Sequence, residues 1–153
     1  IVTLLSILQL VLISNFGSTS LFREEMIEKK LVLTLNTSVE WERKYFVLKV
    51  WAKTKYPLEV LPILKEKLKN LDVYENDIFR KIKSEIANLV LGYEDPEYVN
   101  DIFAYMIVKY GKILTNEKEI LESITIKDIL DVVQKIPMDK MNTFVVNPLK
   151  KGD

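Results

Sequence analysis

The sequence of 153 residues contains no histidine and no cysteine. Because histidine is absent, the chain cannot form a Ser-His-Asp triad, a Cys-His pair or a zinc site with imidazole ligands. The absence of cysteine excludes disulfides and thiolate metal ligands, and it leaves the redox compartment open. Only four glycines occur, and they form neither a G-x-x-x-x-G-K-[ST] nor a G-x-G-x-x-G phosphate-binding motif. We therefore expect that the chain is not an enzyme by itself and carries no cofactor.

An excess of charge of one sign is also lacking, since lysine plus arginine and aspartate plus glutamate number 22 each. A general nucleic-acid-binding protein needs a basic face that displaces counterions from the phosphate backbone. No basic run longer than two residues occurs in the sequence. We therefore expect no nucleic-acid partner. The hydrophobic fraction of 48% and the charged fraction of 29% are typical of a folded globular domain.

The chain begins with an apolar stretch, residues 1–13, which resembles in length the apolar region of a signal peptide. Residues 18–20 would offer small side chains for cleavage. However, no positively charged segment precedes the stretch, and it is shorter than the roughly 20 residues that cross a bilayer. Thr3, Ser6 and Gln9 recur at near-helical spacing, as in a buried helix with one narrow polar stripe. We expect a core helix and no membrane partner. The compartment stays open, with a cytoplasmic location favoured.

The hydrophobic period then changes from helical to alternating. Residues 21–29 are charged and amphipathic and predict a second helix. Alternation over residues 31–36 and 45–52 predicts two strands. The polar residues 39–44 predict a hairpin loop, so the two strands should be antiparallel. Trp41 falls in this predicted loop, where it is either an exposed contact residue or folded back onto the sheet.

The rest of the chain is mostly helical by its apolar period and its capping residues. Helices are predicted over residues 57–71, 77–91 and 96–110, with two shorter helices beginning at Thr115 and Thr125. A last strand is predicted over residues 142–147. No low-complexity linker divides residues 1–153, so we expect one α+β domain, with a mixed or antiparallel sheet and helices packed on one face. The first residue, Ile1, is not methionine, which suggests a piece of a longer chain.

Clusters of carboxylates and aromatics are the remaining candidates for chemistry or binding. They are Glu24, Glu25 and Glu28; Asp72, Glu75 and Asp77; Glu94, Asp95 and Glu97; and Tyr93, Tyr98, Phe103, Tyr105 and Tyr110. We interpret the carboxylates as a solvated helix face and as turn and capping residues. The aromatics recur at helical spacing and are interpreted as packing residues. An enzyme that used only carboxylates would need two of them in a cleft, with perturbed pKa values.

One segment carries a resemblance to a known family. Residues 16–31 read F-G-S-T-S-L-F-R-E-E-M-I-E-K-K-L. This run resembles a segment of the pitrilysin/insulinase-type zinc metallopeptidases, in which an apolar helix leads through a Gly/Ser-rich turn into a pattern like L-F-x-x-L-R-E-x-x-G-L-x-Y and then a hairpin. The later stretches 57–71, 77–91, 124–136 and 142–148 resemble the family's following helices and its closing helix and strand. The resemblance covers nearly the whole chain and implies the family's α+β domain without at least one opening strand.

The resemblance also implies two positions that clamp the substrate, and both are substituted here. Where the family pattern has an arginine this chain has Met26, and where the pattern has a tyrosine it has Leu33. Neither side chain can donate a hydrogen bond to a substrate carbonyl. Arg23 lies one helical turn before Met26 and is a candidate weak substitute. Lys30 replaces the glycine of the pattern.

In such peptidases one of several domains of this fold carries the inverted zinc motif H-x-x-E-H, and the other domains close the chamber. The resemblance therefore implies a non-catalytic domain of the C-terminal type, from a zinc metallopeptidase or from its inactive partner subunit. Zinc is implied only for a catalytic partner domain. The implied partners are a homologous catalytic domain or subunit and, beyond it, a peptide substrate. The alternative is a protein–protein interaction module unrelated to peptidases, which would bind through a helical face or through the edge of the hairpin.

Overall fold

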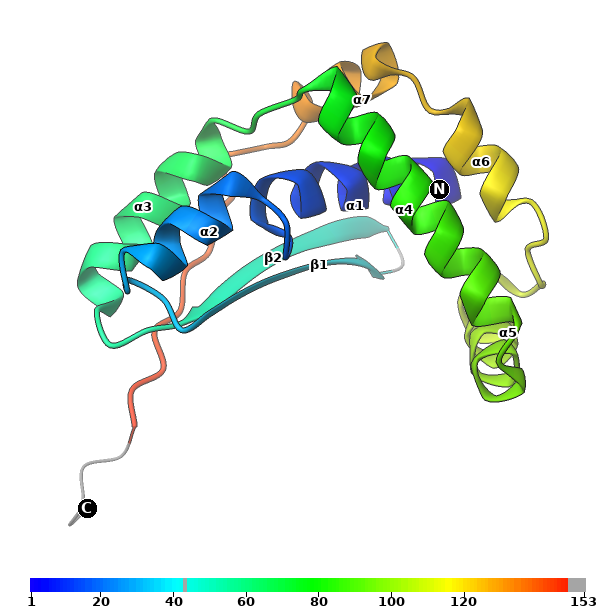
Figure 1. Ribbon diagram of the computed structural model, residues 1–153, viewed down its shortest axis with the longest axis horizontal. Helices are drawn as coiled ribbons and strands as arrows, with labels where there is room; N and C mark the ends of the chain where they lie inside the picture. The colour runs from blue at the N-terminus through cyan, green and yellow to red at the C-terminus, as the bar shows by residue number, and fades with distance from the viewer. Residues whose placement is uncertain (43, 149–153) are drawn as a thin grey trace.

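The computed structural model describes residues 1–42 and 44–148. The elements, in chain order, are α1 (Val2–Phe16), α2 (Leu21–Glu28), β1 (Thr34–Glu42), β2 (Tyr45–Lys53), α3 (Pro57–Lys69), α4 (Glu75–Tyr93), α5 (Pro96–Tyr110), α6 (Glu117–Ser123) and α7 (Ile126–Val133) (Figure 1). The predicted order of two helices, a hairpin and several further helices is confirmed.

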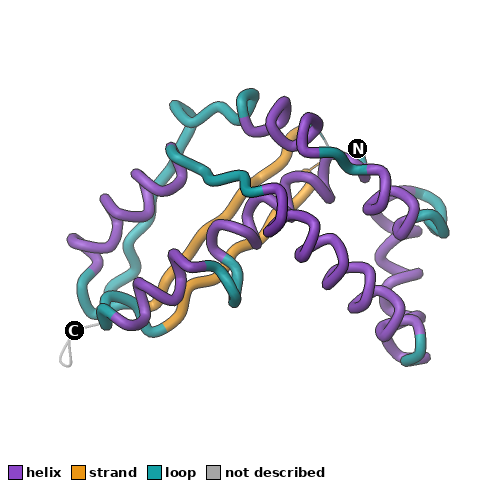
Figure 2. Tube along the Cα trace, turned by 45° about the horizontal axis from the view of Figure 1, so that its top comes forward, coloured by secondary structure: helices purple, strands orange, loops and turns teal. Residues whose placement is uncertain are grey.

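The sheet is an antiparallel hairpin, with Thr34 opposite Lys53 at one end and Glu42 opposite Tyr45 at the other. One face carries apolar side chains that alternate along both strands, as expected for a sheet with one packed side. They are Leu35 and Val39 of β1 and Leu48, Val50 and Ala52 of β2. Helices α1, α2 and α3 lie on this side of the hairpin (Figures 1 and 2). The predicted α+β class, with helices on one face of an antiparallel sheet, is confirmed.

The buried apolar side chains form two clusters that both include α1. The sheet-side core consists of Leu12, Phe16, Met26, Val32, Leu35, Val60 and Leu64. The helix-side core consists of Ile7, Leu10, Val11, Ile78, Ile82, Ile124 and Ile129. Leu71, between α3 and α4, packs against both clusters. Almost all of the buried apolar side chains among the described residues therefore belong to a cluster that packs on one of two faces of α1.

By length and composition alone, the stretch Val2–Glu28 could cross a membrane. In the structure this stretch is two helices, because α1 ends at Phe16 and α2 starts at Leu21. The 15 residues of α1 span about 22 Å, less than the ~30 Å hydrocarbon core of a bilayer. Its second half is buried, with Val11 and Phe16 at 0% exposure. This burial agrees with the core helix that the sequence predicts.

Two boundaries of the hairpin differ from the sequence prediction. The first strand starts at Thr34 rather than near residue 31. The predicted loop 39–44 is wrong up to Glu42, because the strand continues and Trp41 pairs with Phe46. Polar side chains at these positions occupy the solvated face of the strand, which is compatible with pairing. Arg43 lies outside the described residues.

The predicted last strand over residues 142–147 is also wrong, since this segment has no regular secondary structure. Its apolar side chains point into solvent, with Phe144 at 86% and Val146 at 94% exposure. Strand propensity measures how well a side chain fits a pleated and half-buried surface, so a suitable sequence forms a strand only where a neighbour pairs with it. The described part of the chain supplies no such neighbour, and the sheet consists of β1 and β2.

The turn between α2 and β1 and the open edge of β1

The turn from α1 into α2 sets the position of Arg23. At Gly17 an added Cβ would lie 2.3 Å from the carbonyl oxygen of Ile13, so the close approach of the chain at the end of α1 requires glycine. Ser20 then caps α2, because its hydroxyl accepts a hydrogen bond from the backbone N–H of Arg23 at 3.2 Å. The Gly/Ser-rich turn of the sequence pattern thus ends one helix and begins the next.

The end of α2 places Lys30 at a position where glycine is usual. Lys30 adopts the left-handed conformation, with φ of +56°. Its N–H donates to the carbonyl of Ile27 at 2.9 Å, and the N–H of Leu31 donates to the carbonyl of Met26 at 3.0 Å. These two bonds form the Schellman motif, in which the left-handed position usually holds glycine. The backbone of Lys30 therefore adopts a conformation that glycine usually occupies, although this chain has lysine there.

The two positions that the resemblance assigns to a substrate clamp lie in different environments. Met26 is 3% exposed and packs within the sheet-side core, where Leu31 also contacts the cluster. Leu33 is 58% exposed, and its N–H donates to the carbonyl of Lys53 at 2.7 Å just before β1 begins. Only Leu33 is therefore accessible to a ligand, and its side chain offers no polar atom.

Arg23, the candidate substitute, is half-buried and already hydrogen-bonded to the backbone. Its Nε donates to the carbonyl of Leu35 and its Nη1 donates to the carbonyl of Ser18, both at 3.3 Å. The guanidinium thus ties the turn after α1 to the start of β1. This arrangement shows a positioning role within the domain, with part of the guanidinium still exposed.

At the other end of β1, a side chain from a neighbouring element also donates a hydrogen bond to a backbone carbonyl of the strand. Lys109 of α5 donates from Nζ to the carbonyl of Trp41 at 2.9 Å. The rings of Trp41 and Tyr110 stack at 5.7 Å between centroids, and Lys109 approaches Glu42 at 4.0 Å. The sequence left open whether Trp41 is exposed or folded back, and the structure packs it against α5. The contact joins residues 68 positions apart, which periodicity along the chain does not indicate.

Between these two ends, β1 presents an edge that is not paired with β2. Backbone groups of successive residues in a strand point to alternate sides. The carbonyls of Leu35 and Trp41 accept from side chains outside the sheet, so by alternation Thr37 and Val39 also face the outer edge. The part of the chain that the structure describes supplies no strand along this edge.

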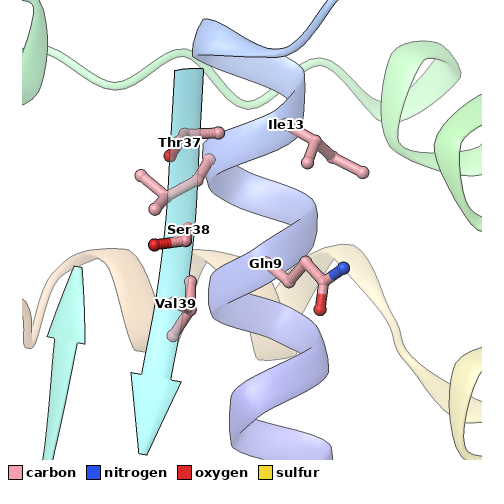
Figure 3. Close-up of a pocket in the computed structure, with 6 residues that line it drawn as sticks. Gln9, Ile13, Thr37, Ser38 and Val39 are labelled. Atoms are coloured by element: carbon pink, nitrogen blue, oxygen red, sulfur yellow. The ribbon is translucent and has the colours of Figure 1, made fainter. Parts of the chain in front are cut away.

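Two hollows follow this edge of β1, between the strand and α1. The smaller, of about 190 Å³, is lined by Gln9, Leu12, Ile13, Thr37, Ser38 and Val39 (Figure 3). The larger, of about 300 Å³, is lined by Ile13, Phe16, Gly17, Ser18, Arg23, Leu35, Asn36, Thr37 and Trp51. They share Ile13 and Thr37, so they form one trough with an apolar wall from α1 and an open strand edge on the other side.

None of the clustered carboxylates lines this trough, and several of them have structural partners. Glu25 pairs with Lys29 one turn later on the exposed side of α2, and this hydrogen bond and charge lower the pKa of Glu25. Asp95 caps α5 by accepting from the N–H of Glu97 at 2.9 Å, as predicted. Within residues 1–42 and 44–148, no three carboxylates come close enough to hold a metal ion together.

The raised pKa values belong to the aromatic cluster at the ends of α4, α5 and α6. Burial and then the neighbouring Tyr105 raise the pKa of Tyr110 to about 12. Burial also raises the pKa of Glu117, whose carboxylate accepts from the hydroxyl of Tyr93 at 3.3 Å. Tyr93 in turn packs against Tyr98 and Phe103. The cluster has a single carboxylate among phenols, which is typical of packing rather than of acid–base catalysis.

Neither a family model nor a curated protein matches the sequence. Among solved structures, the chain is similar to a protein assigned as an M16-like peptidase from Alicyclobacillus acidocaldarius, with a TM-score of 0.76 and 13% sequence identity. The likeness covers 88% of this chain and 33% of that protein, so the chain spans about a third of its neighbour's length. M16 is the peptidase family of pitrilysin and insulinase. At this identity the likeness shows that the fold is M16-like.

Proposed function

We propose that the chain is a non-catalytic domain of a pitrilysin-like zinc metallopeptidase, or of that enzyme's inactive partner subunit. It walls off part of the peptide chamber and pairs with a homologous domain that carries the zinc. The observation that carries this proposal is the M16-like fold, which extends over 88% of the chain. The chain has no histidine, so an inverted zinc motif would have to lie on another domain.

The clamp positions support a role as chamber wall rather than substrate holder. The Met26 side chain is buried in the sheet-side core, and Leu33 offers a substrate only apolar contact. The Nε and Nη1 groups of Arg23 donate to backbone carbonyls of the domain itself. A substrate carbonyl would therefore meet no well-placed donor at the positions where the family pattern supplies two.

Exposed apolar surface supports pairing with another domain. Helices α4 and α5 expose a set of large apolar side chains: Phe79, Val90, Leu91, Tyr93, Tyr98, Tyr105, Ile107 and Val108. Large apolar side chains exposed along two neighbouring helices are typical of a surface that a partner covers. Val108, at 84% exposure, is the most exposed of the set. We place the contact with the catalytic domain on this helix pair.

The first test is the coding sequence upstream of Ile1, read for H-x-x-E-H and a further glutamate downstream. If the motif is found, the longer protein should copurify with zinc in an amount that falls to background when both histidines are replaced by alanine. The chain 1–153 alone should bind no zinc and cleave no peptide. Stoichiometric zinc on chain 1–153, or peptidase activity from it, would contradict the proposal.

A pairing experiment separates this function from that of an unrelated interaction module. Val108→Lys should weaken association of the chain with the zinc-carrying domain at least tenfold, because it places a charge in the apolar contact. Leu58→Lys, at 85% exposure on α3, is the matched control and should leave association unchanged. If no related domain lies upstream and neither variant alters any association, the interaction module becomes the better description.

A further inference from the structure

Lys81 of α4 is a buried lysine without an acidic partner. It is 7% exposed, and its neighbours on α4, Ile78 and Ile82, belong to the helix-side core. A buried ammonium group normally pairs with a carboxylate, because burial removes the water that solvates its charge. Among the described residues, however, the Nζ of Lys81 forms no ion pair, and it donates a hydrogen bond to the hydroxyl of Thr19. Lys81 therefore places an unbalanced positive charge beside a neutral group.

A second cation reaches the same turn from α2. The Nη1 of Arg23 donates to the carbonyl of Ser18 at 3.3 Å, and Arg23 likewise forms no ion pair within the part of the chain that the structure describes. Ser18 and Thr19 are exposed, and Ser20 after them caps α2, whose positive end adds to the field at this turn. Side chains from two different helices thus direct positive charge at the exposed hydroxyl of Thr19.

We propose that Thr19 is a phosphorylation site and that Lys81 holds the phosphoryl group. The transfer forms a bond between Oγ1 of Thr19 and the γ-phosphorus of a nucleoside triphosphate. The bond from that phosphorus to the leaving diphosphate breaks, and the hydroxyl proton passes to the base of the protein kinase that catalyses the step. The modified side chain carries between about 1.5 and 2 negative charges at pH 7 and three strong acceptor oxygens.

The position of Lys81 explains why the charge has to arrive on Thr19. The described residues cover most of the lysine, and its ammonium group already contacts Oγ1, so a phosphoryl group on this oxygen lies within its reach. A charge-assisted contact then replaces a neutral one and ties α4 more firmly to the turn between α1 and α2. The site uses neither zinc nor the exposed apolar side chains of α4 and α5, so it stands apart from the proposed function.

The test is urea unfolding of the chain with Thr19 phosphorylated or unmodified, in the original sequence and in Lys81→Met. Methionine keeps an apolar stem and removes the charge, and circular dichroism checks that the variant folds. Phosphorylation should lower the equilibrium constant of unfolding at least tenfold in the original sequence and no more than threefold in Lys81→Met. Phosphorylation of Ser18 is the matched control, because it adds the same charge to an exposed hydroxyl that is not the partner of Lys81, and it should have no more than a threefold effect.

Two further measurements separate this site from a merely structural contact. Phosphorus-31 NMR should show the second pKa of the phosphate below the value of about 6 for a free phosphate ester, and Lys81→Met should restore that value. Fragment mass spectra of the protein from its own cells should locate a phosphate on Thr19 rather than on Ser18 or Ser20.

Three outcomes would overturn the proposal. The first is equal stabilisation of the original chain and of Lys81→Met by phosphorylation, and the second is cellular protein without phosphate on Thr19. The third is stabilisation of the unmodified chain by inorganic phosphate that Lys81→Met abolishes, which would assign the site to a free anion.

Discussion

The two cores that share α1 differ in how far along the sequence their parts lie. The sheet-side core joins residues 12–64, and its members follow one another through α2, the hairpin and α3. The helix-side core joins Ile7, Leu10 and Val11 to Ile124 and Ile129, more than a hundred residues later. Local turns therefore assemble the first core, whereas the second depends on α4 and α7 returning to α1. Because one helix serves both, damage to α1 should affect both together.

The largest expected effect comes from Phe16→Ala in the sheet-side core. Phe16 is 0% exposed and meets the ring of Phe22 edge-on at 5.5 Å, so its removal should lower the free energy of unfolding by about 4 kcal/mol. Urea unfolding should be followed by tryptophan fluorescence, which reports on the hairpin, and by circular dichroism, which reports mainly on the helices. Both curves should shift equally, and Leu58→Ala on the exposed face of α3 should shift neither. A shift of the fluorescence curve alone would show that the cores unfold separately.

The next largest effect is expected where α1 contacts the connection between α3 and α4. Asn15 is 2% exposed, and its side chain donates to the carbonyl of Asp72 at 2.9 Å and accepts from the Asp72 N–H at 2.8 Å. Asn15→Leu should lower the free energy of unfolding by about 2 kcal/mol, because it leaves backbone groups of the α3–α4 connection without a partner. Asn70→Ala removes an exposed side chain that bonds within its own helix, and it should cost less than about 0.5 kcal/mol. If the two variants lower the free energy of unfolding equally in urea, Asn15 does not stabilise the contact between α1 and the α3–α4 connection.

The fold could be predicted from the sequence where turn and capping residues determine the ends of the helices. Gly17 and Ser20 mark the turn into α2, and Thr125 with Asp128 forms the predicted capping box at the start of α7. The prediction failed at residues 142–147, because a strand depends on a neighbour that its own sequence does not contain. For the site, the sequence pattern assigned Met26 and Leu33 to substituted clamp positions, and that assignment stays a prediction. The engagement of Arg23 with Leu35 and Ser18 could not be predicted, because it depends on the distance between two elements.

A smaller effect, of opposite sign, is expected at the end of α2. Lys30→Gly should raise the free energy of unfolding by about 1 kcal/mol, because the left-handed conformation at φ +56° is strained for a residue with a Cβ. Lys30→Ala keeps the Cβ and loses only an exposed side chain, so it should change stability little. Thermal unfolding of both variants would separate backbone strain from loss of the lysine charge. If alanine stabilises as much as glycine, the strain is not the cause.

An effect confined to high pH is expected at Tyr110, which tests the contact between the hairpin and α5. Burial, and then Tyr105, raise the pKa of Tyr110 from 10.0 to about 12, so the folded chain keeps a proton that the unfolded chain releases. Stability from this group is complete below pH 10 and is lost as the pH rises from 10 to about 12. Tyr110→Phe should therefore lose less stability than the original chain over this interval, and its tyrosinate absorbance should lack the last step of the titration. Tyr45→Phe, exposed on β2, controls for the loss of one phenol. An unchanged alkaline titration in Tyr110→Phe would mean that the stacking on Trp41 does not shield the phenol.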